Sequence, residues 1–191
     1  MTAEQPIVRP SEPTLHKITV AEFLALDEAG FFEERRVELI DGEIYEMSPL
    51  HMGHGRVSAE LAVAVGLALR AFDGFEFTMP VSTELDQHSL LEADMTIVRK
   101  GAGDRLLSRE YVQIVVEISA TSLRYDLGRK LQLYARSGVP EYWVADVVGR
   151  RIIRFHAPAG EAYSRRAEFA FGDAVPAATI TGLVVDTSRL A

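Results

Sequence analysis

The hydrophobic positions of the chain change their spacing several times, and each spacing predicts a different element. From about His54 to Phe72 apolar residues return every three or four positions, the repeat of a helix with one buried face. A second helix is predicted from roughly Asp126 to Ser137, where Gly138 and Pro140 supply stop signals. Between these helices, short apolar runs predict strands at Phe75–Met79, Asp94–Val98 and Val112–Ile118.

The segment before the long helix carries local signals for a capped helix and a hairpin. Thr19 followed by Glu22 forms a capping box, and Gly30 can end the helix that it starts. Asp41-Gly42 lies between two β-prone runs and favours a tight hairpin turn, because both turn residues need positive φ. Residues 1–15 are predicted to form a flexible N-terminal arm and residues 16–191 a single domain.

The predicted elements together indicate an α/β fold. Two further strands are predicted at Tyr142–Val147 and Arg151–His156, and a looser β-rich tail follows Ala162. The order of helix, hairpin, helix, three strands, helix and strands predicts one mixed α+β sheet with helices on its faces. The run Val112–Ile118 is apolar on both faces, as is typical of a buried central strand.

Composition removes several classes of protein. The 191 residues contain no cysteine, which excludes disulfides, thiolate nucleophiles and cysteine-based metal sites and is compatible with a cytoplasmic location. The longest uncharged apolar run, Leu61–Leu69, falls far short of the roughly 20 residues of a membrane span. A net charge of −8 argues against general electrostatic binding of nucleic acid, so such a site must rest on a local patch.

Two acids on predicted strands carry the candidate chemistry. Asp94 begins one strand, and Glu117 lies near the end of the buried central strand. A buried ionised carboxylate is costly unless it is paired or bound to a metal, and most such acids in cores are structural. Two neighbouring carboxylates repel each other, and a divalent cation is their usual neutraliser. Lys130, one of only three lysines, lies on the helix that follows.

These pieces, taken in order, resemble the Uma2 family, also known as DUF820. The resemblance spans about residues 17–160 and rests on the ordered set, since no single motif is specific. It comprises Glu38-Leu-Ile-Asp-Gly-Glu-Ile-Tyr-Glu-Met-Ser-Pro49, His54, Asp94, Glu117-Ile-Ser119 with Thr121, Asp126 and Lys130, and Val139-Pro-Glu-Tyr-Trp-Val-Ala-Asp146. The Uma2 family belongs to the restriction-endonuclease-like, PD-(D/E)xK superfamily.

The resemblance implies an αβββαβ nuclease core, preceded by an N-terminal helix and β-hairpin, and a metal-dependent endonuclease acting on DNA. Asp94 and Glu117 match the two motif acids and would hold Mg²⁺ or Mn²⁺. Two positions depart from the motif. Ala93 stands where proline is usual, and Ser119 occupies the place of the motif lysine. The resemblance implies that Lys130 supplies this lysine from the next helix.

Four further residues are candidates for supporting roles. His54 matches a histidine of the Uma2 pattern, and Gln113 shares the period-2 face of Glu117. Asp126 lies one helical turn before Lys130, so the pair is interpreted either as part of the site or as a surface ion pair. Glu38 is interpreted chiefly as a solvated carboxylate beside the hairpin turn, with a role at the site as the alternative.

Two other functions stay open at this level. One is a catalytically degenerate binding or assembly module of the same fold, favoured by the acidic net charge and by Ser119 at the lysine position. The other is a metal-dependent hydrolase of a small phosphorylated substrate, which a narrow pocket would favour. A homodimer is also expected, since the hairpin and the β-rich tail could offer edge strands.

Overall fold

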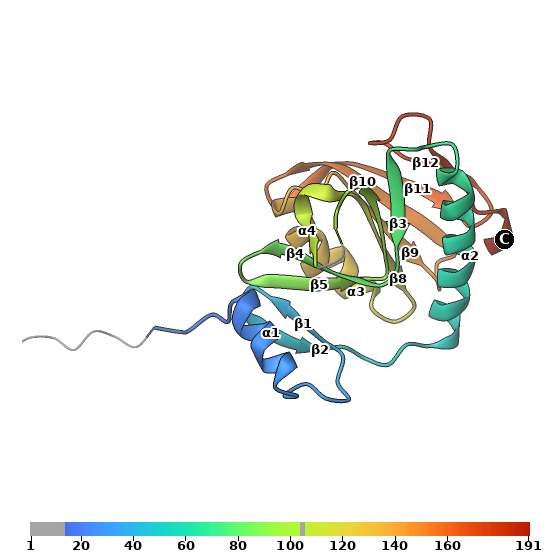
Figure 1. Ribbon diagram of the computed structural model, residues 1–191. Coiled ribbons are helices and arrows are strands. Elements are labelled where there is room, and N and C mark those ends of the chain that lie inside the picture. The colour runs from blue at the N-terminus through green and yellow to red at the C-terminus, as the bar shows by residue number, and fades with distance from the viewer. Residues whose placement is uncertain (1–13, 104–105) are drawn as a thin grey trace, which may run out of the picture.

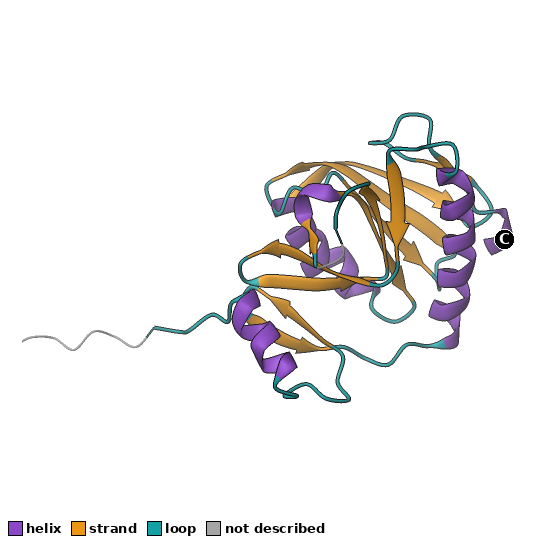
Figure 2. Cartoon of the chain, viewed as in Figure 1, coloured by secondary structure: helices purple, strands orange, loops and turns teal. Residues whose placement is uncertain are grey.

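A computed structural model describes residues 14–103 and 106–191, so most of the predicted arm lies outside the described residues. The helical elements are α1 (Val20–Glu28), α2 (Met52–Leu69), the 3₁₀ turn η1 (Arg109–Tyr111), α3 (Leu123–Tyr125), the π-helical turn η2 (Asp126–Lys130), α4 (Leu131–Arg136) and the 3₁₀ turn η3 (Ser188–Leu190). Figure 1 follows their order along the chain, and Figure 2 separates helices from strands. No helix among the described residues is long and apolar enough to cross a membrane.

The larger sheet has six strands and contains the predicted central strand. Its order is β11 (Ala162–Ala170), β10 (Arg151–Ala159), β9 (Glu141–Asp146), β8 (Val112–Ser119), β6 (Met95–Arg99) and β3 (Phe75–Thr78). The pairing of β8 with β9 is parallel and the other pairings are antiparallel. All eight residues of β8 are buried, which confirms that this strand is central.

The strands do not form the single sheet expected from the sequence. A second sheet has the order β2 (Glu43–Glu46), β1 (Val37–Ile40), β5 (Ser89–Ala93), β4 (Val81–Asp86) and β7 (Leu107–Ser108). A small third sheet pairs β12 (Ala174–Pro176) with β13 (Val184–Asp186). The second sheet arises because the N-terminal hairpin pairs with β5, a strand that the sequence analysis did not predict.

The predicted N-terminal elements are confirmed. Thr19 caps α1, and the reciprocal contacts with Glu22 complete the capping box. Asp41 and Gly42 have φ values of 56° and 79°, as the tight turn between β1 and β2 requires. The helix predicted from Asp126 begins earlier, at Leu123, and its middle turn is π-helical rather than α-helical. Single π turns of this kind occur frequently at functional sites.

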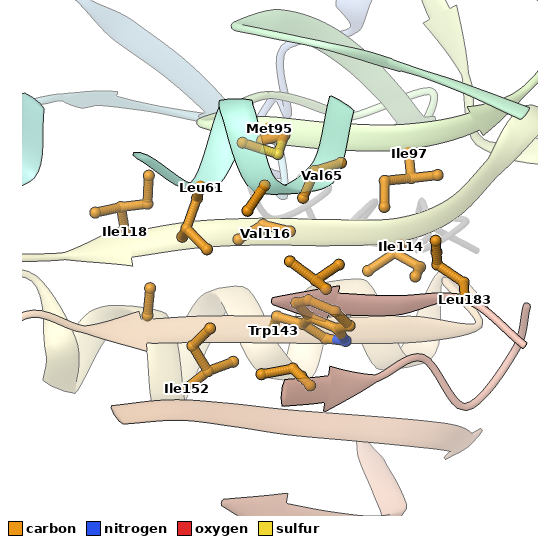
Figure 3. Packing of buried hydrophobic residues seen from close by; sticks show 14 of the residues in the cluster. Leu61, Val65, Met95, Ile97, Ile114, Val116, Ile118, Trp143, Ile152 and Leu183 are labelled. Atoms are coloured by element: carbon orange, nitrogen blue, oxygen red, sulfur yellow. The ribbon is translucent and has the colours of Figure 1, made fainter. Parts of the chain in front are cut away.

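The hydrophobic core lies on both faces of the six-stranded sheet. Helix α2 covers one face, where Leu61 and Val65 pack against Val116 and Trp143 (Figure 3). The other face packs against α4, which contributes Leu133 and Tyr134, and against residues of the second sheet. Figure 1 shows α2 on one side of the strands and α3 and α4 on the other. The six-stranded sheet thus has α2 on one face and α4 with part of the second sheet on the other.

Asp94 lies where the chain passes from one large sheet to the other. It is the single residue between β5, in the five-stranded sheet, and β6, in the six-stranded sheet. Its Oδ2 accepts a hydrogen bond of 2.7 Å from the backbone N–H of Ile118 on β8. The carboxylate therefore continues the β6–β8 contact beyond Met95, where the backbone pairing ends.

Candidate active site

A cavity of about 440 Å³ opens where the two large sheets separate. Its lining includes the connection between β2 and α2 and the segment that leads into α3. The residues that line it are Arg36, Glu38, Tyr45, Glu46, Met47, Ser48, Pro49, Leu50, His51, His54, Glu92, Asp94, Glu117, Ile118, Ala120, Thr121, Ser122, Tyr125, Asp126 and Lys130. Six of the seven candidate site residues from the sequence line it, which leaves only Gln113 outside.

The two motif acids reach the cavity from the junction of β5 and β6 and from the neighbouring strand β8. Asp94 is held by the N–H of Ile118 on one oxygen, and His54 Nε2 lies 3.0 Å from the other oxygen. His54 comes from the first turns of α2 and is itself buried. The imidazole thus fixes the orientation of the Asp94 carboxylate, which is the supporting position predicted for it.

Lys130 joins two carboxylates inside the protein. Its Nζ donates to Glu117 Oε1 and to Glu38 Oε1, each at 3.0 Å. Only 3% of each of these three residues is exposed. The helix that carries Lys130 lies on the sheet face opposite α2, so its ammonium reaches the end of β8. The structure thereby brings Lys130 to Glu117 although Ser119 stands at the motif position.

The interpretation of Glu38 as a solvated hairpin carboxylate is wrong. Its Oε1 also accepts from the backbone N–H of Glu92 at 3.3 Å, and its Oε2 is buried with no hydrogen-bond partner in the described chain. Both faces of the hairpin are covered, because Leu39 packs in the cluster beneath α1 and Ile40 packs toward α4. Glu38 is therefore part of the interior of the site.

Asp126 and Lys130 do not form the surface ion pair considered as an alternative. Both side chains are buried, and Asp126 Oδ2 instead accepts from the hydroxyls of Ser119 and Ser122, each at 2.5 Å. Ser119 thus uses its hydroxyl to position an acid of the following helix. Gln113 is buried, but its amide donates to the carbonyl of Val112 and it does not line the cavity.

Two tyrosines of the site were not singled out by the sequence. The Tyr134 hydroxyl donates to Glu117 Oε1 at 2.7 Å, and Tyr125 lies 6.0 Å from Lys130 Nζ, measured to its ring centre. Tyr134 falls on the apolar face of the predicted second helix, and helical periodicity cannot separate a hydrogen-bonding role from packing there. Its position one turn after Lys130 is the signal that would have indicated it.

The site holds more acid than base. Burial raises the pKa of Glu117 well above its ordinary value, and the charges of Asp94, Asp126 and Glu38 raise it further, against the lowering effect of Lys130. Burial also raises the pKa of Glu38 and of Asp126. Burial alone would lower the pKa of Lys130, but Glu117, Glu38 and Asp126 raise it overall. Lys130 is thus a stable cation among carboxylates that outnumber it.

The carboxylates of the site suit one kind of metal ion. Among the described residues, no three acid or imidazole side chains gather closely enough to enclose a metal by themselves. Both side-chain donors that reach Glu117 contact Oε1, which leaves Oε2 without a side-chain donor among the described residues. Mg²⁺ typically binds through one or two carboxylates and completes its shell with water and phosphate oxygens. The residues present fit that kind of ion better than a structural zinc.

Comparison with known proteins gives the family and the fold of this chain. A crystal structure described as a putative nuclease belonging to DUF820 from Anabaena variabilis superposes with a TM-score of 0.69, at 14% identity, over 91% of this chain and 97% of that chain. At this identity the match shows the fold alone. A search of curated proteins finds no match. The family model described as "Uma2: Putative restriction endonuclease" matches residues 20–188. The chain therefore belongs to the Uma2 family and shares the fold of the DUF820 structure.

Proposed function

We propose that this protein is a Mg²⁺- or Mn²⁺-dependent endonuclease that hydrolyses phosphodiester bonds in DNA. The observation that carries the proposal is the meeting of Asp94, Glu117 and Lys130 in one cavity, from a junction between strands, a strand and a helical turn. Family membership and the nuclease fold support the reaction class. The excess of carboxylates supports a cation as the missing partner, since these acids alone would repel a phosphate.

Asp94 and Glu117 would hold the cation. When bound there, a divalent ion supplies a water nucleophile at neutral pH and polarises the scissile phosphate. His54 holds Asp94 in place from one side, and the N–H of Ile118 holds it from the other. This double support fixes the ligand before substrate arrives, which is how a site is preorganised.

Lys130 would act on the reacting groups as a fixed positive charge. Its ammonium is held by Glu117 and Glu38, and the carboxylates around it keep it protonated. A preorganised cation in a site shielded from water stabilises negative charge that develops on the phosphate. Glu38 is then a positioning residue, because it orients Lys130 through the hydrogen bond of 3.0 Å.

One observation favours a second candidate, hydrolysis of a small phosphorylated substrate. The cavity of about 440 Å³ is in the range of pockets that enclose small ligands. The acids at its end are also deeply buried, with Glu117 3% exposed. The same hydrolytic chemistry would serve DNA or a small phosphorylated substrate. The two candidates therefore differ in whether a DNA strand can enter the cavity.

The test is nicking and cleavage of supercoiled plasmid in Mg²⁺, Mn²⁺ or EDTA by wild type, Asp94→Ala and Lys130→Ala. We expect metal-dependent cleavage that both variants lose. Lys100→Ala is the matched control, because Lys100 is exposed and does not line the cavity. Cleavage retained by Asp94→Ala would contradict the proposal. If the wild type hydrolyses bis(4-nitrophenyl) phosphate but no plasmid, the small-substrate candidate replaces it.

A further inference from the structure

A second hollow, formed by Thr121, Ser122, Arg124, Tyr125 and Arg129, adjoins the cavity just described. It shares Thr121, Ser122 and Tyr125 with the cavity wall, so the two hollows are continuous across the start of α3. We propose that this second hollow binds a backbone phosphate of the same nucleic-acid strand whose scissile phosphate lies at Asp94 and Glu117. The inference rests on the proposed function and specifies how that site holds its substrate.

The charges that line the two hollows are opposite. The cavity contains Glu38, Asp94, Glu117 and Asp126, which suit a cation, whereas the described lining of the second hollow has two arginines and no acid. Asp41 and Glu43 balance Arg129 at the edge of this hollow, so Arg124 is the cation left for an anion in a chain with a net charge of −8. A strand leaving the cavity along Tyr125 would meet this hollow next.

Arg124 has the group that an anion would bind. Its side chain is exposed, and it forms no ion pair with any described residue. A guanidinium with its donors free is suited to planar, bidentate contact with phosphate oxygens. The nearby hydroxyl of Thr121 also lines the hollow, whereas that of Ser122 is used by Asp126.

Arg129 is held in place with donor capacity left over. Its Nη2 contacts Asp41 Oδ2 at 3.3 Å and Glu43 Oε2 at 3.2 Å, and its guanidinium lies 4.9 Å from the centre of the Tyr45 ring. Its Nε is buried and has no hydrogen-bond partner in the described chain. The hairpin thus fixes one arginine at the edge of the hollow, and Arg124 supplies the unpaired charge.

The test measures binding of a fluorescein-labelled DNA oligonucleotide by fluorescence anisotropy, in Ca²⁺ and over a series of salt concentrations. Wild type is compared with Arg124→Ala and with Arg70→Ala. Arg70 is a matched control because it is exposed and lies at the far end of α2, about 27 Å from the helix start at the cavity. Arg124→Glu, which reverses the charge, serves as a second variant.

We expect Arg124→Ala to weaken binding about tenfold at low salt and to reduce the slope of log K against log salt by about 0.7 to 0.9, as loss of one phosphate contact predicts. Arg124→Glu should weaken binding further, and Arg70→Ala should match the wild type. Equal effects of Arg124→Ala and Arg70→Ala, or no binding by the wild type, would overturn the inference. Plasmid cleavage by the wild type tests the proposed function separately, so the two can fail independently.

Discussion

Lys130 Nζ and Glu117 Oε1 lie 3.0 Å apart although the two residues are 13 positions apart, on a π-helical turn and a strand. The motif lysine would reach this region from the same strand as the acid, two positions later, where Ser119 stands. The helix instead delivers the ammonium from the side, and Ser119 holds Asp126 on that helix. Ser119 thus has a structural role at the position where the motif would place a lysine.

Replacement of Lys130 by methionine should destabilise the protein in a pH-dependent way. It leaves Glu117 and Glu38 buried without their cation, which costs about 3 to 5 kcal/mol when both are ionised. Protonation relieves this cost, so the loss should be larger at about pH 8 than at about pH 5. The measurement is urea unfolding of Lys130→Met and wild type at both pH values.

Lys100→Met is the control for this comparison, because it removes an exposed lysine and should change the unfolding free energy by less than about 0.5 kcal/mol. An equal loss for Lys130→Met at both pH values would show that packing, rather than uncompensated charge, explains its effect.

Glu38→Gln should lower turnover without weakening metal binding. Glu38 orients Lys130 and is expected to contact neither the cation nor the substrate, so kcat should fall about 10- to 100-fold while KM and the Mn²⁺ affinity stay unchanged. Plasmid cleavage and Mn²⁺ titration measure these quantities. Glu84→Gln, an exposed change on β4, is the control. A parallel loss of Mn²⁺ affinity in Glu38→Gln would make Glu38 a metal ligand instead.

The acids of the site were predictable from local pattern, and Glu38 was not. Glu117 interrupts an apolar strand and Asp94 begins the predicted strand before it, so both were conspicuous within a few residues. The burial of Glu38 depends on a helix more than 80 residues later that covers the second face of the hairpin. Hairpin sequence alone suggests one solvated face, and only tertiary packing overrides it.

The order of the main helices and strands was predicted from the sequence, but the strands β4 and β5 were missed. The strands β4 and β5 are joined at Gln87-His88, which lacks the glycine of a usual tight turn, and Glu84 and Asp86 keep one face of β4 polar. The alternation over Val81–Asp86 is a strand signal, but no turn signal beside it marked a hairpin. This missed hairpin supplies the surface on which the N-terminal hairpin pairs, and so it explains the second sheet.

Manganese should stabilise the folded protein through Asp94 and Glu117. An ion that binds only the folded state adds about 2.7 kcal/mol at 100 times its Kd, and a thermal shift assay detects this as a higher Tm. We expect the shift in the wild type and its loss in Asp94→Asn. Glu46→Gln removes an exposed acid from the cavity rim and should keep the shift. A shift retained by Asp94→Asn would place the ion elsewhere.

Glu141→Gln should destabilise the C-terminal segment without affecting the site. The carboxylate of Glu141 is fully buried and accepts from Trp143 Nε1, from the backbone N–H groups of Ala178 and Thr179, and from the Thr179 hydroxyl. In Glu141→Gln the side-chain NH₂ would face these N–H and O–H donors and could not accept their hydrogen bonds. We expect this to lower the unfolding free energy by about 2 to 3 kcal/mol. Glu76→Gln, on the exposed side of β3, is the control for chemical denaturation. Equal midpoints for both variants would contradict the role of Glu141 as an anchor.

Without metal, the unfolding free energy of the wild type should fall as pH rises above the ordinary pKa of Glu117, because the folded protein raises that pKa and so favours the protonated carboxyl. The pKa of Glu117 is raised above its ordinary value of 4.5, chiefly by burial, so the unfolding free energy falls as pH increases above that value. Lys130 is protonated in both states over this range and contributes no slope. A tenfold difference in proton affinity between the folded and unfolded states is worth about 1.4 kcal/mol.

Glu117→Gln should flatten the pH dependence of the unfolding free energy measured in EDTA. A saturating concentration of Mn²⁺ should flatten it in the wild type, because a cation replaces the proton. An identical slope in wild type and Glu117→Gln would show that Glu117 stays ionised in the folded protein and that Lys130 alone balances it.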